Sequence, residues 1–321
     1  MNIEQTVAEL IRKAYEKLKA SDAEGAAALL EEALQIDFDN EETKHALKCV
    51  NWWIEHTARI EEIKNPYEKG GYILSRLKQY YLFLEGVAPY GAPDGGSNFD
   101  QCQYAIRRYV FSGALHCFND LLGDGVNQHD PGLLLLVGRC YKGIGNYDEA
   151  LKYLEQAVRF RREDGEVLAD LADVNAMLGN HLEAKALFRE AFFLNPEKID
   201  LRGMESEMIL RLRDKLYQEK NYQEKELREW MPVYGRLWGV FPVTRELKPI
   251  EFGRLKQSIF TLETECRGNP GQSALLKPRL INRYFWLIDH YENTRDDSDL
   301  IEEVRLKIKM TDPEIYELYI K

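Results

Sequence analysis

The residues that could carry chemistry in this chain of 321 amino acids are few and widely separated. Its six histidines and five cysteines are scattered and include no Cys-x-x-Cys pair. His116 and Cys117 are the only neighbouring pair of these types, and adjacent helical side chains point about 100° apart, which suits neither a shared metal nor a base with its nucleophile. We therefore expect no metal site and no cofactor, and we expect the cysteines to be buried, reduced thiols. The cysteines are Cys49, Cys102, Cys117, Cys140 and Cys266.

Sequence motifs typical of enzymes are also missing. There is no Gly-x-x-x-x-Gly-Lys phosphate loop, no Gly-x-Gly-x-x-Gly, no His-Glu-x-x-His and no Gly-x-Ser-x-Gly. The segment "GDGVNQHD" places Asp124, Asn127 and Asp130 close together, but it lacks the alternation and the terminal glutamate of a calcium loop. We interpret it as an ordinary connection and predict that the protein is not an enzyme.

Composition narrows the class of protein further. The net charge of −11 disfavours broad binding to nucleic acid, which requires many cations near phosphates. No run approaches the roughly 18 apolar residues that span a bilayer, and the first residues lack the pattern of a secretory signal. We therefore expect a cytoplasmic protein with no membrane span and no nucleic-acid partner.

One pattern in the sequence returns after 34 positions. Residues 137–158, "VGRCYKGIGNYDEALKYLEQAV", are matched by residues 171–192, "LADVNAMLGNHLEAKALFREAF". Such a period is typical of arrays of helical hairpins. The matched positions include Gly138 with Ala172, Gly145 with Gly179, Asn146 with Asn180, Glu149 with Glu183, and Ala150 with Ala184.

These residue types specify a hairpin. Small side chains let two helices approach closely where their axes cross, and a glycine can take the left-handed conformation that ends a helix. We predict that Gly145 and Gly179 do so, and that Asn146 and Asn180 cap the helices that follow. The glutamate three positions after each asparagine would complete a capping box.

The chain resembles the tetratricopeptide repeat family at these positions. The match is strong over residues 131–198, with Pro196 in its expected place, and looser over residues 8–41, where Phe38 stands in the usual position of proline. The resemblance implies an all-α fold, a superhelical solenoid of antiparallel helical hairpins, here with irregular helical extensions. It also implies a protein or peptide partner held in the concave groove.

Helical periodicity extends over almost the whole chain and indicates four regions. Residues 1–63 form a repeat-like hairpin followed by a long helix that runs on to Asn65-Pro66. Residues 64–130 form an irregular helical region with a Gly/Pro-rich loop, "GVAPYGAPDGGSN". Residues 131–198 form the two clear repeats. Residues 199–321 form a C-terminal extension with helices expected at 249–266, 273–292, 298–309 and 313–320.

The candidate partner-binding residues lie on the first helix of each clear repeat, opposite its packing positions. Two cationic residues of the first repeat would lie beside two anionic residues of the second. This arrangement favours a partner segment of mixed charge with an apolar anchor. The alternative interpretation is that these charged side chains only keep an exposed surface hydrated. The same anionic residues disfavour the carboxylate clamp that the family implies. The candidates are Arg139, Lys142, Asp170, Asp173 and Met177.

A second candidate surface is the aromatic stripe of Trp230, Tyr234 and Trp238, although core packing is the favoured interpretation of these residues. We expect a non-enzymatic scaffold or adaptor. Two alternatives stay open: residues 199–321 form a small-ligand or enzymatic domain served by the repeats, or the protein is a peptide-sensing regulator. The partner and the oligomeric state are not defined by the sequence.

Overall fold

The computed structural model describes residues 3–87, 97–123, 129–268, 273–294 and 298–320. These residues form fifteen α-helices and three short 3-10 helices, with no strand among them, so the predicted all-α fold is confirmed. Within the same residues, no helix combines the length and apolar character required to cross a membrane. The Gly/Pro-rich loop (88–96) and most of the calcium-like segment (124–128) lie outside the described residues.

The chain divides into two compact units, residues 1–157 and 158–321, and the division falls inside one helix of the segment that the sequence analysis treats as two repeats. Each unit has its own hydrophobic core. The first unit contains α1 (Ile3–Lys19), α2 (Ala23–Ile36), α3 (Glu41–Thr57), α4 (Pro66–Val87), α5 (Ser97–Gly123), α6 (Pro131–Gly143) and most of α7 (Tyr147–Phe160).

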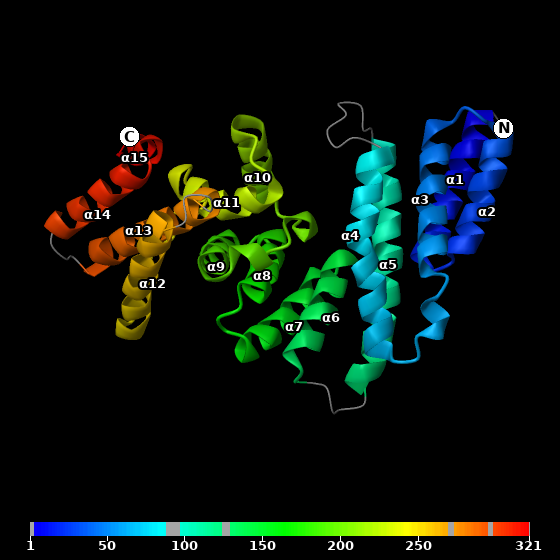
Figure 1. The fold of residues 1–321 in the computed structure, drawn as a ribbon. Coiled ribbons are helices and arrows are strands. Elements are labelled where there is room, and N and C mark those ends of the chain that lie inside the picture. The colour runs from blue at the N-terminus through cyan, green and yellow to red at the C-terminus, as the bar shows by residue number, and fades with distance from the viewer. Residues whose placement is uncertain (1–2, 88–96, 124–128, 269–272, 295–297, 321) are drawn as a thin grey trace. The chain divides into compact units, whose positions relative to one another are not determined.

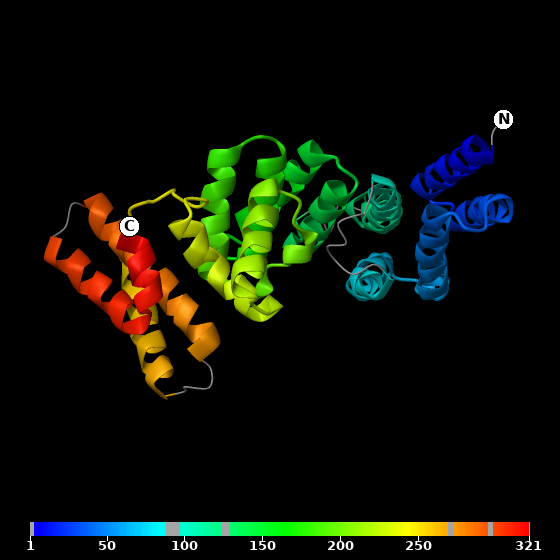
Figure 2. The same ribbon diagram turned by 90° about the horizontal axis from the view of Figure 1, so that it is seen from above.

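Four of these helices pack against α5. The hairpin of α1 and α2 is followed by α3, and α5 packs against α1, α3, α4 and α6 (Figure 1). In Figure 2, α4 and α5 are seen nearly along their axes and lie side by side. Trp53 and Tyr80 fill the space between α3 and α4, with ring centroids 5.1 Å apart. The core of the first unit draws its buried residues from α1 to α6.

The long helix expected up to Asn65-Pro66 is shorter than predicted. α3 ends at Thr57, and a separate 3-10 helix, η1 (Ile60–Glu62), follows it. Carbonyl oxygens in the last turn of α3 accept hydrogen bonds from side chains. The Thr57 hydroxyl donates to the Trp53 oxygen, and the Tyr72 hydroxyl of α4 donates to the His56 oxygen at 3.0 Å. Because these contacts come from another helix and from a side chain of the last turn, periodicity alone could not locate the end.

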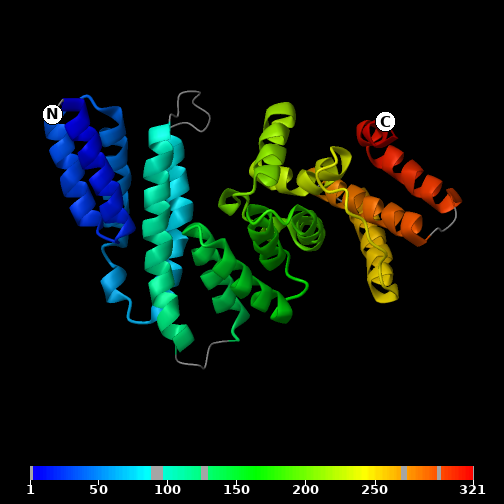
Figure 3. The ribbon, with the colours of Figure 1, turned by 180° about the vertical axis from the view of Figure 1, so that it is seen from behind.

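The second unit contains α8 and α9, followed by α10 and α11. In the C-terminal group, α13 packs on α12 and α14 (Figure 3). The C-terminal helices begin at the predicted residues and end within two residues of the predicted positions. The elements are α8 (Gly165–Met177), α9 (His181–Leu194), η2 (Pro196–Lys198), η3 (Leu201–Gly203), α10 (Glu207–Lys220), α11 (Glu224–Leu237), α12 (Pro249–Gly268), α13 (Ser273–Thr294), α14 (Ser298–Thr311) and α15 (Pro313–Ile320).

The small residues are required where the hairpin helices cross. A Cβ atom added to Gly138 on α6 would lie 2.7 Å from the Leu154 side chain on α7, and one added to Gly165 on α8 would lie 2.6 Å from the Ala191 carbonyl oxygen on α9. Both distances are shorter than van der Waals contact allows. A methyl group would therefore force the Leu154 side chain to shift at Gly138 and the backbone of α9 to shift at Gly165.

The turns of the two hairpins confirm part of the predicted capping. Gly145 and Gly179 have φ angles of +83° and +84°, the left-handed conformation expected after a helix. The Asn146 side chain accepts the Glu149 amide at 3.3 Å, as a cap should.

Two capping predictions are wrong. The Asn180 side chain donates to the Asn175 side chain at 3.2 Å and makes no capping bond. The predicted hydrogen bond from the Asn146 amide to the Glu149 carboxylate does not form. The Asn146 amide donates instead to the Tyr141 oxygen at 2.9 Å, and the Glu149 carboxylate pairs with Lys152. The Asn146 amide, which a capping box would bind, therefore already has an acceptor within the glycine turn.

Candidate protein-binding sites

The two cationic residues of the predicted groove lie on α6 in the first unit. Arg139 is half-buried, whereas Lys142 is buried, with 5% of its surface exposed. A lysine so deeply buried presents little of its ammonium group to a partner. The expectation that Lys142 lines an open surface is therefore wrong, and only Arg139 keeps substantial exposure.

The anionic residues of the predicted groove lie on α8 in the second unit, and both are buried. Asp173 accepts the backbone amides of Glu205 and Ser206, with its nearest oxygen 2.8 Å from the Ser206 nitrogen. These amides precede α10, so the carboxylate holds the start of that helix. Asp173 thus has an internal structural role, and the prediction that Asp170 and Asp173 form an exposed anionic step is wrong. Met177 is the exposed member of this set on α8.

The aromatic stripe of α11 is mostly part of the core of the second unit. Trp230 and Tyr234 are buried, and the Trp230 ring stacks on Tyr222 with an interplanar angle of 4°. Trp238 is half-buried, and the Lys215 ammonium lies 3.9 Å from its ring centroid. This burial agrees with core packing rather than with an interaction surface.

Two neighbouring cavities of the second unit share the same pair of arginines on α13. One cavity, of about 200 Å³, lies among the end of α9, η2, α11 and α13. The other, of about 370 Å³, lies between α12 and α13. Arg279 and Arg283 line both of them, one helical turn apart on α13. A chain crossing either cavity would therefore meet both guanidinium groups.

Several arginines of the second unit form ion pairs with buried or half-buried carboxylates. Arg279 forms ion pairs with Glu229 and Glu197, and its hydrogen bonds to Glu229 raise the pKa of Arg279. Arg189 and Arg236 both pair with Asp289, whose side chain is almost fully buried. Arg279 thus has two carboxylate partners, whereas Arg189 and Arg236 share one.

Arg283 differs from these neighbours. Among the described residues, no carboxylate lies within ion-pair distance of Arg283. Its Nε donates to the Ser258 hydroxyl at 3.2 Å, and its guanidinium lies 3.8 Å from the centroid of the Phe193 ring. Burial, together with the nearby charge of Arg279, lowers the pKa of Arg283 to about 10, so the group remains cationic at neutral pH.

Burial of this cation is unfavourable, and the charges of Glu229 and Glu197 offset only part of the cost, since neither forms a direct ion pair with Arg283. An anionic group placed in either cavity would offset that cost and could accept the planar donors of the guanidinium. Arg283 was not predicted as a site residue. Residues 278–286, "PRLINRYFW", have the apolar pattern of a core helix, and nothing in this segment indicates which of its two arginines lacks an ion-pair partner.

Residues that could hold a metal occur in the first unit, contrary to the expectation from spacing. His45 and Cys49 on α3 and Cys102 on α5 are buried, and their ligand atoms all lie within 4.8 Å of one another. All five cysteines are free thiols, and all but Cys266 are buried, as expected. A hydrogen bond from the Cys102 thiol, against the effect of burial, lowers the pKa of Cys49 to about 5, and the same contact raises the pKa of Cys102.

The described residues thus form an all-α protein of helical hairpins. The tetratricopeptide repeat family model matches residues 131–164, the first of the two clear repeats. The chain therefore contains a tetratricopeptide repeat, a module of protein–protein interaction, and the resemblance inferred from the sequence is confirmed for that unit. No curated protein matches the chain at a significant level.

Proposed function

We propose that this chain is a non-enzymatic scaffold or adaptor that binds a segment of a partner protein. The observation that carries the proposal is the tetratricopeptide repeat at residues 131–164, a module built for protein interaction. The stacking of hairpins places binding surfaces on preformed helices, which spares part of the ordering cost of binding.

The site that the geometry favours is the pair of cavities along α13, and the partner segment that fits it is acidic. Arg283 supplies a cation without a carboxylate counterion, and the Phe193 ring keeps its guanidinium plane in place. Glu229 and Glu197 hold Arg279 beside it and balance the two arginines in the smaller cavity, whereas the lining of the larger cavity contains Arg254, Arg279 and Arg283 and no carboxylate. We expect an aspartate, a glutamate or a chain-terminal carboxylate of the partner to contact this guanidinium.

A small anionic ligand is the second candidate, and it corresponds to the alternative in which residues 199–321 serve a small molecule. The larger cavity, of about 370 Å³, favours it, since this volume falls near the lower end of the range for small-molecule sites, whereas the smaller one, of about 200 Å³, lies below that range. The two candidates differ in what they require: a peptide uses both cavities and the surface between them, whereas a small anion needs only one.

Binding of a synthetic peptide array by the purified full chain tests the proposal. The array contains acidic, basic and uncharged segments, and we expect the chain to retain acidic ones. Arg283→Gln should weaken their binding by about 10- to 100-fold, since a hydrogen bond to a charged group contributes about 1.5 to 3 kcal/mol. Arg211→Gln is the matched control, because it removes the same charge from an exposed position on α10.

Three results would contradict this assignment. They are retention of no peptide, equal retention by the Arg283→Gln variant, and loss of binding in the Arg211→Gln control. A thermal-shift screen with small dicarboxylates and phosphate separates the second candidate. Stabilisation by such an anion that Arg283→Gln abolishes, with no peptide retained, would support the small-ligand function instead.

A further inference from the structure

The polar cluster of the first unit lies in a different unit from the cavities of α13 and does not depend on the proposed function. His45 and Cys49 are one helical turn apart on α3, so both side chains point to the same side of that helix. Cys102 approaches them from α5. The surrounding core of α1, α3, α4 and α5 consists mostly of aliphatic and aromatic side chains. Two thiols and an imidazole meeting at one point in such a core call for an explanation.

The separation of the Cys49 and His45 ligand atoms fits a tetrahedral metal ion. The Cys49 sulfur lies 3.5 Å from the His45 Nε2 atom. Zinc bonds of about 2.3 Å to sulfur and about 2.05 Å to nitrogen place two such ligands about 3.6 Å apart at the tetrahedral angle. All three ligand atoms lie within 4.8 Å of one another, so only small side-chain shifts are required to close the set around an ion.

Further polar groups contact the three ligands, and the Gln103 amide would turn from the His45 Nε2 atom to the Cys49 sulfur when an ion binds. Gln103 directs its amide nitrogen toward His45 Nε2 at 3.4 Å and toward the Cys49 sulfur at 3.7 Å, while its oxygen accepts the Tyr80 hydroxyl at 3.0 Å. On the other side, the Tyr15 hydroxyl contacts Cys102 and donates to Glu42 at 3.1 Å. Such outer groups orient ligands and tune their basicity.

Charge also favours a divalent cation at this point. Two thiolates and a neutral imidazole around Zn²⁺ sum to zero net charge, which lowers the cost of burial compared with a lone thiolate. Thiolate and imidazole are ligands that zinc prefers, whereas magnesium and calcium prefer oxygen. The ligand set therefore selects a thiophilic ion.

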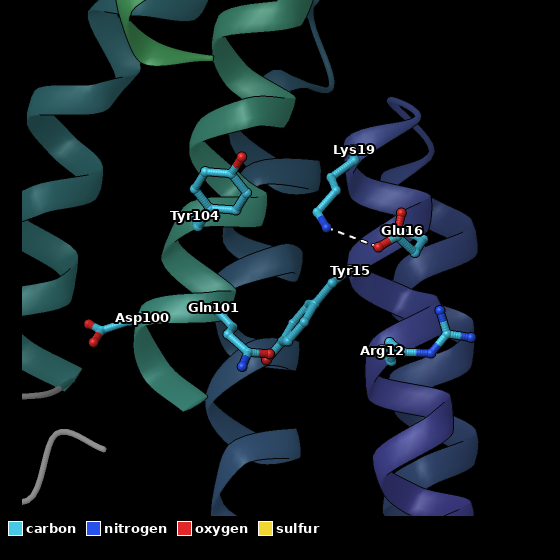
Figure 4. Close-up of a pocket in the computed structure, with 7 residues that line it drawn as sticks. All are labelled: Arg12, Tyr15, Glu16, Lys19, Asp100, Gln101 and Tyr104. Carbon is cyan, nitrogen blue, oxygen red and sulfur yellow. Dashed lines mark hydrogen bonds and ion pairs between the residues drawn. The ribbon is translucent and has the colours of Figure 1, made fainter. Parts of the chain in front are cut away.

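An opening lies beside the cluster. A cavity of about 410 Å³ between α1 and α5 is lined by Tyr15, Lys19 and Tyr104, among others. Figure 4 shows Tyr15 on α1 and Gln101 on α5 extending toward one another across this cavity. Tyr15 therefore contacts both the cavity and, through Cys102, the cluster.

We propose that His45, Cys49 and Cys102 form a zinc site with three protein ligands and water in the fourth position. The ion would join α3 to α5 through residues more than fifty positions apart in the chain. It would thereby stabilise the packing of the first unit.

The test is zinc binding by the purified, metal-free full chain, kept reduced with a phosphine. Titration with ZnCl₂ against a chromogenic chelator should give one tightly bound ion per chain. Titration with Co²⁺ should give thiolate-to-cobalt charge-transfer absorption and the intense visible bands of a tetrahedral site. Cys102→Ser should weaken zinc binding by about 100-fold or more, and Gln103→Leu by about 10- to 100-fold.

Cys117→Ser is the matched control, because Cys117 is also buried on α5 but lies outside the cluster. It should leave zinc affinity unchanged. Should Cys102→Ser fail to fold by circular dichroism, the cobalt spectrum of the unmodified chain decides, since its charge-transfer intensity counts the bound thiolates. The proposal is overturned by absence of zinc binding at micromolar concentration, by a cobalt spectrum without thiolate bands, by equal affinity in Cys102→Ser, or by binding of Cu⁺ without Zn²⁺.

Discussion

The carboxylate of Asp173 accepts the backbone amide of Ser206 at 2.8 Å, and the two residues lie 33 positions apart. Through this contact α8 holds the first turn of α10, so a residue that the sequence placed on a binding surface belongs to the internal support of the second unit. The contact explains why an acidic side chain is tolerated at a fully buried position, because both of its oxygens have amide partners.

Asp173→Ala should destabilise the second unit. The change leaves the amides of Glu205 and Ser206 without their acceptor in a buried environment, which we expect to cost about 2 kcal/mol or more. Urea unfolding followed by circular dichroism measures the loss. Asp148→Ala is the control, since Asp148 is an exposed residue of α7, and it should shift the free energy of unfolding by less than about 0.5 kcal/mol. Equal stability of the two variants would show that the Asp173 contact contributes nothing.

Asp289→Asn should be more damaging still. Asp289 is the shared partner of Arg189 and Arg236, and its loss leaves the buried Arg189 guanidinium without a counterion. Breaking such a buried pair costs about 3 to 5 kcal/mol. Denaturant unfolding with Glu207→Gln as control makes the comparison, because Glu207 pairs with Arg211 at the surface and should contribute about 0.5 kcal/mol or less. Similar effects of the two substitutions would refute the buried-pair argument.

Two glycine substitutions in the second unit should change stability in opposite directions. Gly179→Ala places a Cβ atom on a residue with φ of +84°, which costs about 1 kcal/mol although the surrounding space is open. Gly253→Ala lies within α12, with no atom near the added methyl group, and should stabilise the protein by about 0.5 to 1 kcal/mol. Thermal unfolding should therefore give melting temperatures on either side of the unmodified chain. Shifts in the same direction would contradict the left-handed turn at Gly179.

Arg283→Lys should reduce the affinity for an acidic peptide even though the charge is kept. Lysine lacks the planar fork that donates to a carboxylate and stacks on the Phe193 ring, so we expect about a 10-fold loss. Raising the salt concentration should weaken binding to the unmodified chain only moderately, because the guanidinium is half-buried and poorly screened. Fluorescence anisotropy with a labelled acidic peptide provides both measurements. Full affinity in Arg283→Lys would show that charge alone, without geometry, determines binding.

Local features of the hairpins were accessible from the sequence alone. The starts of the C-terminal helices, the left-handed glycines at 145 and 179 and the Asn146 cap all depend on residues a few positions apart. Backbone conformation and capping act over such short distances, so residue type and spacing are sufficient to predict them. The 34-residue period added the pairing of helices, because the same small residues must recur wherever the same two helices cross.

The character of each site was decided only by tertiary structure. Nothing near Asp173 in the chain indicates that the amides of Glu205 and Ser206 will reach it, and nothing near Cys49 indicates that Cys102 will lie beside it. In the same way, Arg279 and Arg283 lie one turn apart on α13, yet Arg279 forms ion pairs with two carboxylates and Arg283 forms none among the described residues. Burial, charge balance and ligand geometry depend on which distant residues the packing of helices brings together. The sequence therefore determined the hairpins, whereas their packing determined which side chains remained available to bind.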